Sequence, residues 1–220
     1  MRKQALLKRP STLRRHKNAL AEEPAREARN GRLKRKDWIR AGQNMLRERG
    51  ISGLKLFSLT SRLGVSTGSF YHHFSDFEEY LGAVAQYYSA DLVQGLIDRT
   101  MTGNPDPTTR MRRLAQLSLA DKTFDLDAAM RIWATMDERA AVTVERAEKL
   151  VLNFLGRAFE DLGFQPMEAA LRSRILLSVN LVPLLTTRGS IRRNLFRRTL
   201  DILVSPGDSS SQKRKRNQSG

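Results

Sequence analysis

The sequence predicts an all-α protein with two parts, an N-terminal three-helix unit of the helix-turn-helix type and a larger C-terminal helical domain. Apolar residues recur at the three- and four-residue spacing of helices, and no convincing run of alternating polar and apolar residues predicts a strand. Glycines and prolines interrupt the helical pattern at intervals that suit helices of ordinary length. The 220 residues are enough for a sizeable core.

The N-terminal part is predicted to hold three helices. The first begins near Asp37 and ends at Gly50, and its apolar residues follow helical spacing: Trp38, Ala41, Met45 and Leu46. A second apolar set precedes Gly64: Leu54, Leu56, Leu59 and Leu63. Ser66 or Thr67 then caps a short third helix, because hydroxyl side chains accept hydrogen bonds from free backbone N–H groups. The apolar face of this helix is formed by Phe70 and Phe74.

A long helix is predicted to follow. Ser75-Asp76-Phe77-Glu78 fits the capping box S-x-x-E, and apolar residues continue at helical spacing until Gly103 and Pro105. Further helices are predicted at about 107–122, 126–138, 140–162, 166–187 and 190–203. Asp125 is interpreted as a capping carboxylate at a helix start.

Both ends of the chain are strongly basic. The formal net charge is +16, and residues 1–36 hold thirteen Lys and Arg against three Glu, while a KRKR run occupies 213–216. We expect a disordered basic N-terminal arm at 1–34 and a disordered basic tail at 205–220. Such ends suit nucleic acid, because neutralising its phosphates releases counterions. Solvation alone is the alternative, and for the KRKR run it explains the charge at least as well.

Several classes of site are not expected. The chain has no cysteine, which excludes disulfides and cysteine-ligated zinc and fits a reducing compartment. No stretch approaches the roughly 20 apolar residues of a membrane span, and no secretory signal is present, so we expect a cytoplasmic protein without a membrane partner. His72 and His73 are adjacent rather than four residues apart, so no metal site is predicted, and no cofactor is expected.

One motif points to an enzyme. Residues 64–68 match G-x-S-x-G, the nucleophile elbow of esterases, in which the serine follows a buried strand. Here a polar helix end precedes the motif, and strands and helices do not alternate downstream. His72 and His73 lie too near Ser66 to arrive from a separate loop as a triad base does. Ser66 is better explained as a helix cap, and no catalytic residue is predicted.

The third helix has the side chains that a DNA-reading helix needs. A recognition helix presents short polar groups to the major groove while its back packs on the preceding helix. Four residues offer such groups: Thr67, Ser69, His72 and His73. Gly68 allows the backbone to approach a phosphate, and the hydroxyl of Tyr71 suits a phosphate oxygen. The alternative for Tyr71 is a packed aromatic ring with its hydroxyl in solvent.

Residues 38–81 resemble the DNA-binding domain of the tetracycline-repressor (TetR) family of bacterial regulators. The matching residues are Ala41-Gly42, Gly50, Leu59, Gly64-Val65-Ser66, Gly68, Tyr71, His73-Phe74, Glu78-Glu79 and Leu81. Residues 129–134 and Gly163-Phe164 resemble a pattern of one TetR-type group. The resemblance covers about 36–204. It implies a DNA-binding domain at 35–81, with its helix-turn-helix at about 55–74, and a ligand-binding and dimerisation domain at 82–204.

The resemblance implies a homodimeric transcriptional regulator, more often a repressor, that binds double-stranded DNA at a pseudo-palindromic operator and is released by an unknown small-molecule effector. The implied DNA-binding residues are Lys36, Lys55, Ser66, Thr67, Gly68, Ser69, Tyr71, His72 and His73. The candidate ligand-binding residues are Tyr88, Trp133, Met136, Phe154 and Asn180, and ordinary core packing is the alternative for each. The last two helices would form the dimer interface, with core and interface positions not separated: Ile175, Leu176, Val179, Leu195, Leu200 and Leu203.

Two positions depart from the family pattern. Lys55 stands where a capping threonine is usual, and Phe77 stands where a lysine usually meets a DNA phosphate. We expect the basic arm, with residues 34–36, to compensate for the missing anchor. The alternative function is a DNA-bound interaction or architectural protein without a small-molecule ligand, attached mainly through its basic ends.

Overall fold

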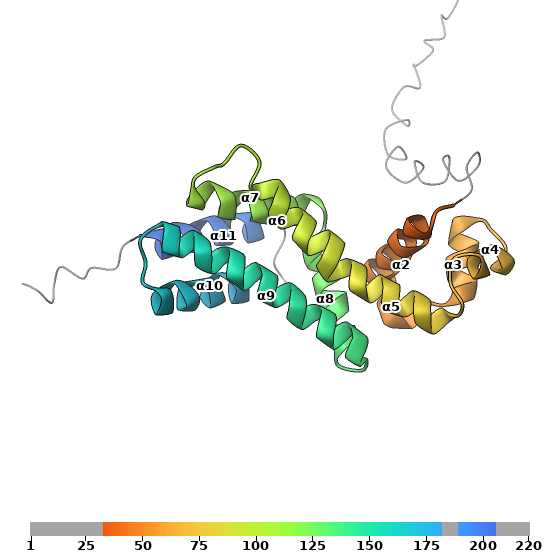
Figure 1. Cartoon of the computed structure of the whole chain (residues 1–220). Helices are drawn as coiled ribbons and strands as arrows, with labels where there is room; N and C mark the ends of the chain where they lie inside the picture. Colours follow the sequence, from red (N-terminus) through yellow and green to blue (C-terminus); the bar gives the residue numbers. More distant parts are fainter. Residues whose placement is uncertain (1–32, 182–188, 206–220) are drawn as a thin grey trace, which may run out of the picture.

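The computed structural model describes residues 33–181 and 189–205, and every regular element in this part of the chain is a helix. The predicted arm and tail therefore lie almost wholly outside the described residues. Figure 1 shows the helices of residues 35–71 gathered at one end and the helices of the body at the other. No helix within the described ranges is both long enough and apolar enough to cross a membrane.

The N-terminal unit consists of three helices, as the sequence predicts, and one short turn that was not predicted. Their bounds are α2 Arg35–Arg49, the 3-10 turn η1 Ile51–Gly53, α3 Leu56–Leu63 and α4 Thr67–Tyr71. Gly50 and Gly64 end α2 and α3, and both have a φ of 67°. Residues with a side chain avoid this conformation, which explains why glycine stands at both turns.

One helical segment continues from the N-terminal unit into the body. It comprises α5 Phe77–Tyr87, the π-helical turn η2 Tyr88–Val93 and α6 Gln94–Thr100 (Figure 1). Its cap differs from the predicted box by one residue. Asp76, not Ser75, is the N-cap and accepts from the Glu79 backbone N–H at 2.7 Å, while the Glu79 carboxylate accepts from the Ser75 N–H at 2.7 Å. The carboxylate of Asp76 takes the capping position, which leaves Ser75 just outside the helix.

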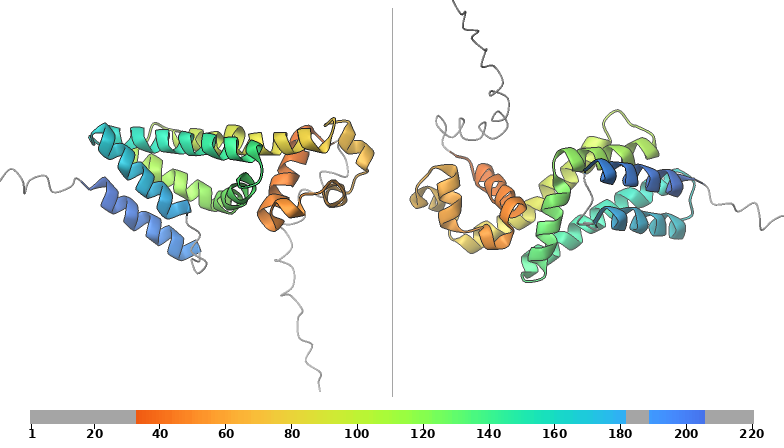
Figure 2. Two further views of the ribbon diagram at one scale, coloured as in Figure 1. Left: turned by 90° about the horizontal axis from the view of Figure 1, so that it is seen from below. Right: turned by 180° about the vertical axis from the view of Figure 1, so that it is seen from behind.

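The described part of the body contains five further helices. Their bounds are α7 Pro107–Ala120, α8 Thr123–Ala134, α9 Glu138–Asp161, α10 Pro166–Leu181 and α11 Gly189–Val204. Figure 2 shows α10 and α11 side by side, far from α3 and α4. The prediction for α8 was wrong at its start, because Lys122 turns the chain with a φ of 52° and acts as the N-cap. Asp125 is therefore not the cap but lies in the first turn, where its charge still favours the helix dipole.

An aromatic core holds the N-terminal unit together. The rings of Trp38 and Phe70 meet edge to face with centroids 5.5 Å apart, and both side chains are fully buried. The buried Tyr80 hydroxyl donates a hydrogen bond to the Trp38 carbonyl at 3.0 Å. Gly42 makes room for this contact, since a Cβ there would lie 2.1 Å from the Tyr80 hydroxyl oxygen. The first turn of α5 is thereby fastened to α2 directly behind α4.

We predict that Gly42→Ala lowers the free energy of unfolding by about 1–3 kcal/mol, because the new methyl group must displace the Tyr80 ring from a filled core. Gly82→Ala is the matched control, since a Cβ there meets nothing within 4 Å. The control should be neutral or gain up to about 1 kcal/mol of helix propensity. Urea denaturation measures both, and equal effects of the two substitutions would contradict the packing described.

Candidate nucleic-acid interface and internal cavity

Helix α4 has an apolar back and an exposed polar front. Ser66 caps the helix as predicted, its Oγ accepting a hydrogen bond from the Ser69 backbone N–H at 3.4 Å. Phe70 and Phe74 are buried on the back, with stacked rings 5.2 Å apart. The hydroxyl of Ser66 is thus used to begin a helix, which leaves the esterase interpretation without structural support.

The candidate DNA-binding residues of α4 fall into two groups. Four are exposed, namely Ser66, Thr67, Gly68 and His72, and Tyr71 is 55% exposed although its ring edge packs on Phe70. Ser69 and His73 are half-buried. The His73 ring lies 6.1 Å from the Trp38 ring, and its carbonyl accepts from Arg35 Nε at 3.3 Å. The His73 ring is therefore partly packed against the core, whereas the side chains of Tyr71 and His72 are accessible to solvent.

Lys55 and an aromatic neighbour extend the exposed surface at the start of α3. Lys55 is the exposed N-cap of α3 and makes no capping hydrogen bond through its side chain. Phe57 is 81% exposed, and sequence reasoning missed it because an apolar residue beside Leu56 suggests core. The structure separates the two, since Leu56 packs against the core and Phe57 points to solvent. An exposed aromatic ring is suited to apolar contact with a sugar or a thymine methyl group.

The basic residues at the start of α2 are not equivalent. Lys34 and Lys36 are exposed. Arg35 instead pairs with Glu79 at 2.6 Å, and its guanidinium lies 4.5 Å from the centre of the Phe74 ring. This arginine, although exposed like the two lysines, joins α2 to the cap of α5, so its charge already has a partner within the protein.

Phe77, at the position where the family resemblance implies a lysine, packs against the core. Its ring lies 5.5 Å from the Tyr80 ring and 6.2 Å from the Phe70 ring, and it packs against the core while half-buried. The neighbouring Glu78 turns toward the body, where Arg139 pairs with its carboxylate at 2.8 Å and donates to its carbonyl at 3.0 Å. Asp137 holds the same arginine, and this hydrogen bonding keeps the pKa of Asp137 below its usual value. The first turn of α5 is thus tied to the α8–α9 corner.

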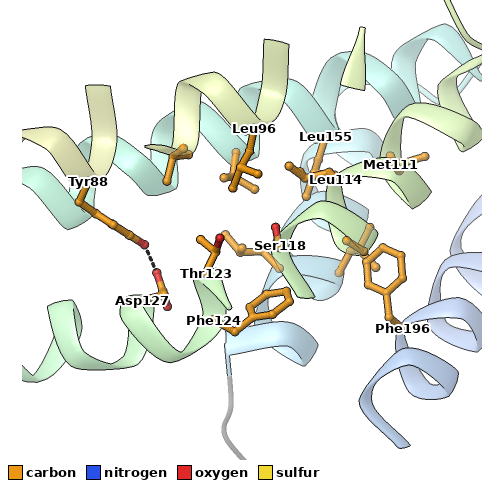
Figure 3. Close-up of a pocket in the computed structure, with 15 residues that line it drawn as sticks. Tyr88, Leu96, Met111, Leu114, Ser118, Thr123, Phe124, Asp127, Leu155 and Phe196 are labelled. Carbon is orange, nitrogen blue, oxygen red and sulfur yellow. Dashed lines mark hydrogen bonds between the residues drawn. The ribbon is translucent and has the colours of Figure 1, made fainter. Parts of the chain in front are cut away.

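A cavity of about 90 Å³ lies in the body, between the η2 turn and helices α7 to α11 (Figure 3). Its lining is mostly apolar and includes Val93, Leu96, Met111, Leu155, Leu176 and Phe196. The polar lining residues are Tyr88, Ser118, Thr123 and Asp127. The cavity is enclosed by elements far apart in the sequence, so only the folded chain could reveal most of its lining.

Tyr88 marks one end of the cavity, where its hydroxyl donates a hydrogen bond to Asp127 (Figure 3). Burial, and then the charge of Asp127, raise the pKa of Tyr88 well above its usual value. Arg131 pairs with Asp127 at 2.8 Å and with Glu148 at 2.5 Å. The Asp127 carboxylate is therefore already paired with two groups, the Tyr88 hydroxyl and the Arg131 guanidinium.

The other candidate ligand-binding residues do not line this cavity. Trp133 is buried and donates through its indole N–H to Asp137 at 3.1 Å, and Phe154 is a core residue. Met136 is 67% exposed at the end of α8, because that helix stops two residues before it. The side chain of Asn180 lies outside the described residues. Tyr88 is thus the one predicted residue, among those described, that the cavity contains. The described residues contain no group of three or more side chains able to hold a metal ion.

Comparisons with known proteins give one family and a common fold. Residues 39–84 match the family described as bacterial regulatory proteins, tetR family. No curated protein matches the chain. A transcriptional regulator from Rhodococcus sp. Rha1 shares its fold with a TM-score of 0.63 and 17% identity, over 78% of this chain and 96% of that one. E. coli NemR in its reduced form does so with a TM-score of 0.63 and 20% identity, over 79% of this chain and 99% of that one. A TetR transcription regulator from Haloarcula marismortui has a TM-score of 0.62 and 18% identity, over 77% of this chain and 95% of that one.

The matched segment spans α2 to the middle of α5, which includes the capped helix α4 and its exposed polar front. Two of these structures, from Rhodococcus sp. Rha1 and Haloarcula marismortui, are described as transcriptional regulators. The N-terminal unit thus matches the tetR family of bacterial regulatory proteins, and the chain shares its fold with two solved transcriptional regulators.

Proposed function

We propose that the chain is a homodimeric repressor that reads a pseudo-palindromic operator with α4 and leaves it when a small molecule occupies the body. The observation that carries the DNA-reading part is the exposed polar front of α4 over a buried aromatic back. This is what a recognition helix requires, since its front must reach base edges while its back is held still. Lys36 and Lys55 add exposed cations that suit phosphates.

The dimer part of the proposal is supported by exposed apolar stripes on the last two helices. On α10 the stripe consists of Met167, Leu171 and Ile175, and on α11 it consists of Ile191, Leu195 and Ile202. The opposite faces are buried through Leu176, Leu200 and Leu203, which assigns these three predicted positions to the core. Exposed apolar stripes of this kind are typical of protein interfaces. Two such helices from each of two chains suit a four-helix bundle.

The release part of the proposal is supported by the helical segment 77–100. Its first turn is fastened to α2 by the Tyr80 hydroxyl, and the Tyr80 ring packs on the back of α4 with its centroid 5.5 Å from that of Phe70. Its η2 turn lines the cavity through Tyr88. A molecule in the cavity that prefers one position of this segment would shift the spacing of the two recognition helices. Its effect is limited to the difference in its affinity for the two positions.

The front of α4 is tested by His72→Ala and Tyr71→Phe. Each should weaken operator binding by about 1–3 kcal/mol if the side chain contacts DNA, with His72→Ala also relaxing base preference. Tyr87→Phe, in α5 and outside the α4 front, is the control and should bind as the parent does. Fluorescence anisotropy with a selected operator measures these constants, and unchanged binding in folded His72→Ala and Tyr71→Phe proteins would refute this role for α4.

The basic start of α2 is tested by salt dependence. Deleting residues 1–33 and changing Lys34→Gln and Lys36→Gln, with Arg35 retained for its contact with Glu79, should weaken binding to all sequences. The slope of log K against log salt should fall by about 0.9 for each phosphate that the variant no longer neutralises. Lys149→Gln, an exposed cation on α9, is the control. An unchanged slope would exclude the compensating arm, and a steep slope without base preference would favour an architectural protein.

The dimer is tested by Leu171→Glu combined with Ile175→Glu. Charges in the α10 stripe should convert the dimer to a monomer, because paired carboxylates cannot be buried in an apolar interface. Ile132→Glu is the control, since Ile132 is at least as exposed as the two mutated residues but lies on α8, outside the stripes. Analytical ultracentrifugation measures the mass, and a dimer that survives the double change would place the interface elsewhere.

A further inference from the structure

The cavity contains a buried hydroxyl group that has no partner. Thr123 is the first residue of α8 and is 7% exposed, and its Oγ1 makes no hydrogen bond. Leaving such a group unsatisfied costs about 1–3 kcal/mol. Figure 3 shows Thr123 between Ser118 and Asp127 on the wall of the cavity, with apolar side chains opposite. Ser118, also buried, is the last residue of α7 that lines the cavity.

The charges around the cavity restrict what it can hold. Asp127 is the one charged residue among the described lining residues, and no Lys, Arg or His is among them. An anionic group would therefore enter without a cation to meet it, which is costly in an apolar space. A cationic group would find the Asp127 carboxylate already held by Tyr88 and Arg131. Both facts favour an uncharged molecule.

We propose that the cavity binds an uncharged, mostly apolar molecule carrying a hydroxyl or carbonyl group, and that Thr123 forms the hydrogen bond that selects this group. The inference rests on the proposed release by a small molecule and names its chemical class. A hydroxyl side chain can donate to a carbonyl and can either donate to or accept from a hydroxyl, so Thr123 serves both. The apolar walls formed by Leu96, Met111 and Leu155 bind the remainder of the molecule.

A matched set of one-ring probes tests this selection with the full-length protein. Toluene, p-cresol, p-toluate and p-methylbenzylammonium share a ring and a methyl group and differ in the head group. Calorimetric or NMR titration gives their dissociation constants. We expect p-cresol and toluene to bind and the two charged probes to bind at least ten-fold more weakly than p-cresol.

Thr123→Val tests whether Thr123 forms the hydrogen bond that selects the head group. It keeps the shape of the side chain and removes the hydroxyl. The substitution should therefore weaken the binding of p-cresol about two- to ten-fold and leave the binding of toluene unchanged or slightly tighter. Thr143→Val is the control, because Thr143 is a buried threonine of α9 outside the cavity lining. Thermal unfolding of each variant establishes that it is folded.

Three outcomes would overturn the inference: tight binding of a charged probe, equal effects of Thr123→Val on p-cresol and toluene, or no binding by any probe. Operator binding by the ligand-free protein is measured separately. Loss of the probe selectivity with operator binding intact rejects the ligand class alone, whereas absent operator binding with the selectivity intact rejects the proposed function alone.

Discussion

The helical segment from Phe77 to Thr100 is the element on which the rest of the structure depends. At about 1.5 Å per residue it is about 35 Å long, which carries it from the back of α4 into the middle of the body. Tyr80 fastens its first turn to α2, and Tyr88 presents it to the cavity. The two tyrosines are eight residues apart, about 12 Å along the axis, so α4 and the cavity contact the same helical segment.

The π-helical turn η2 gives this segment its one irregularity. It occupies Tyr88–Val93, and both of its end residues line the cavity. Turns of this kind are rare within helices and occur often at functional sites. At the other end, the Arg139 contact with Glu78 holds the first turn of α5 to the α8–α9 corner. The body thus holds the first turn of the segment, and the irregular turn of the segment lines the cavity. This arrangement is suited to coupling the cavity to α4.

Local sequence signals predicted the N-terminal unit well and the cavity poorly. Gly50 and Gly64 end helices and Ser66 caps one, as predicted, because turns and caps depend on residues that are neighbours in the chain. The start of α8 was missed because a left-handed Lys122 leaves no signal in the sequence. Thr123 was missed for a related reason, because its importance comes from what surrounds it in space. Sequence spacing likewise could not tell Leu176, which is core, from Ile175, which is exposed.

The central claim is that α4 reads DNA in a symmetric pair. Selection of bound fragments from genomic DNA by the purified full-length protein, followed by sequencing, tests it most directly. The proposed function predicts an enriched pseudo-palindrome whose half-sites present successive major grooves, roughly 34 Å apart. Enrichment of fragments by length alone, without a shared inverted repeat, would contradict the claim.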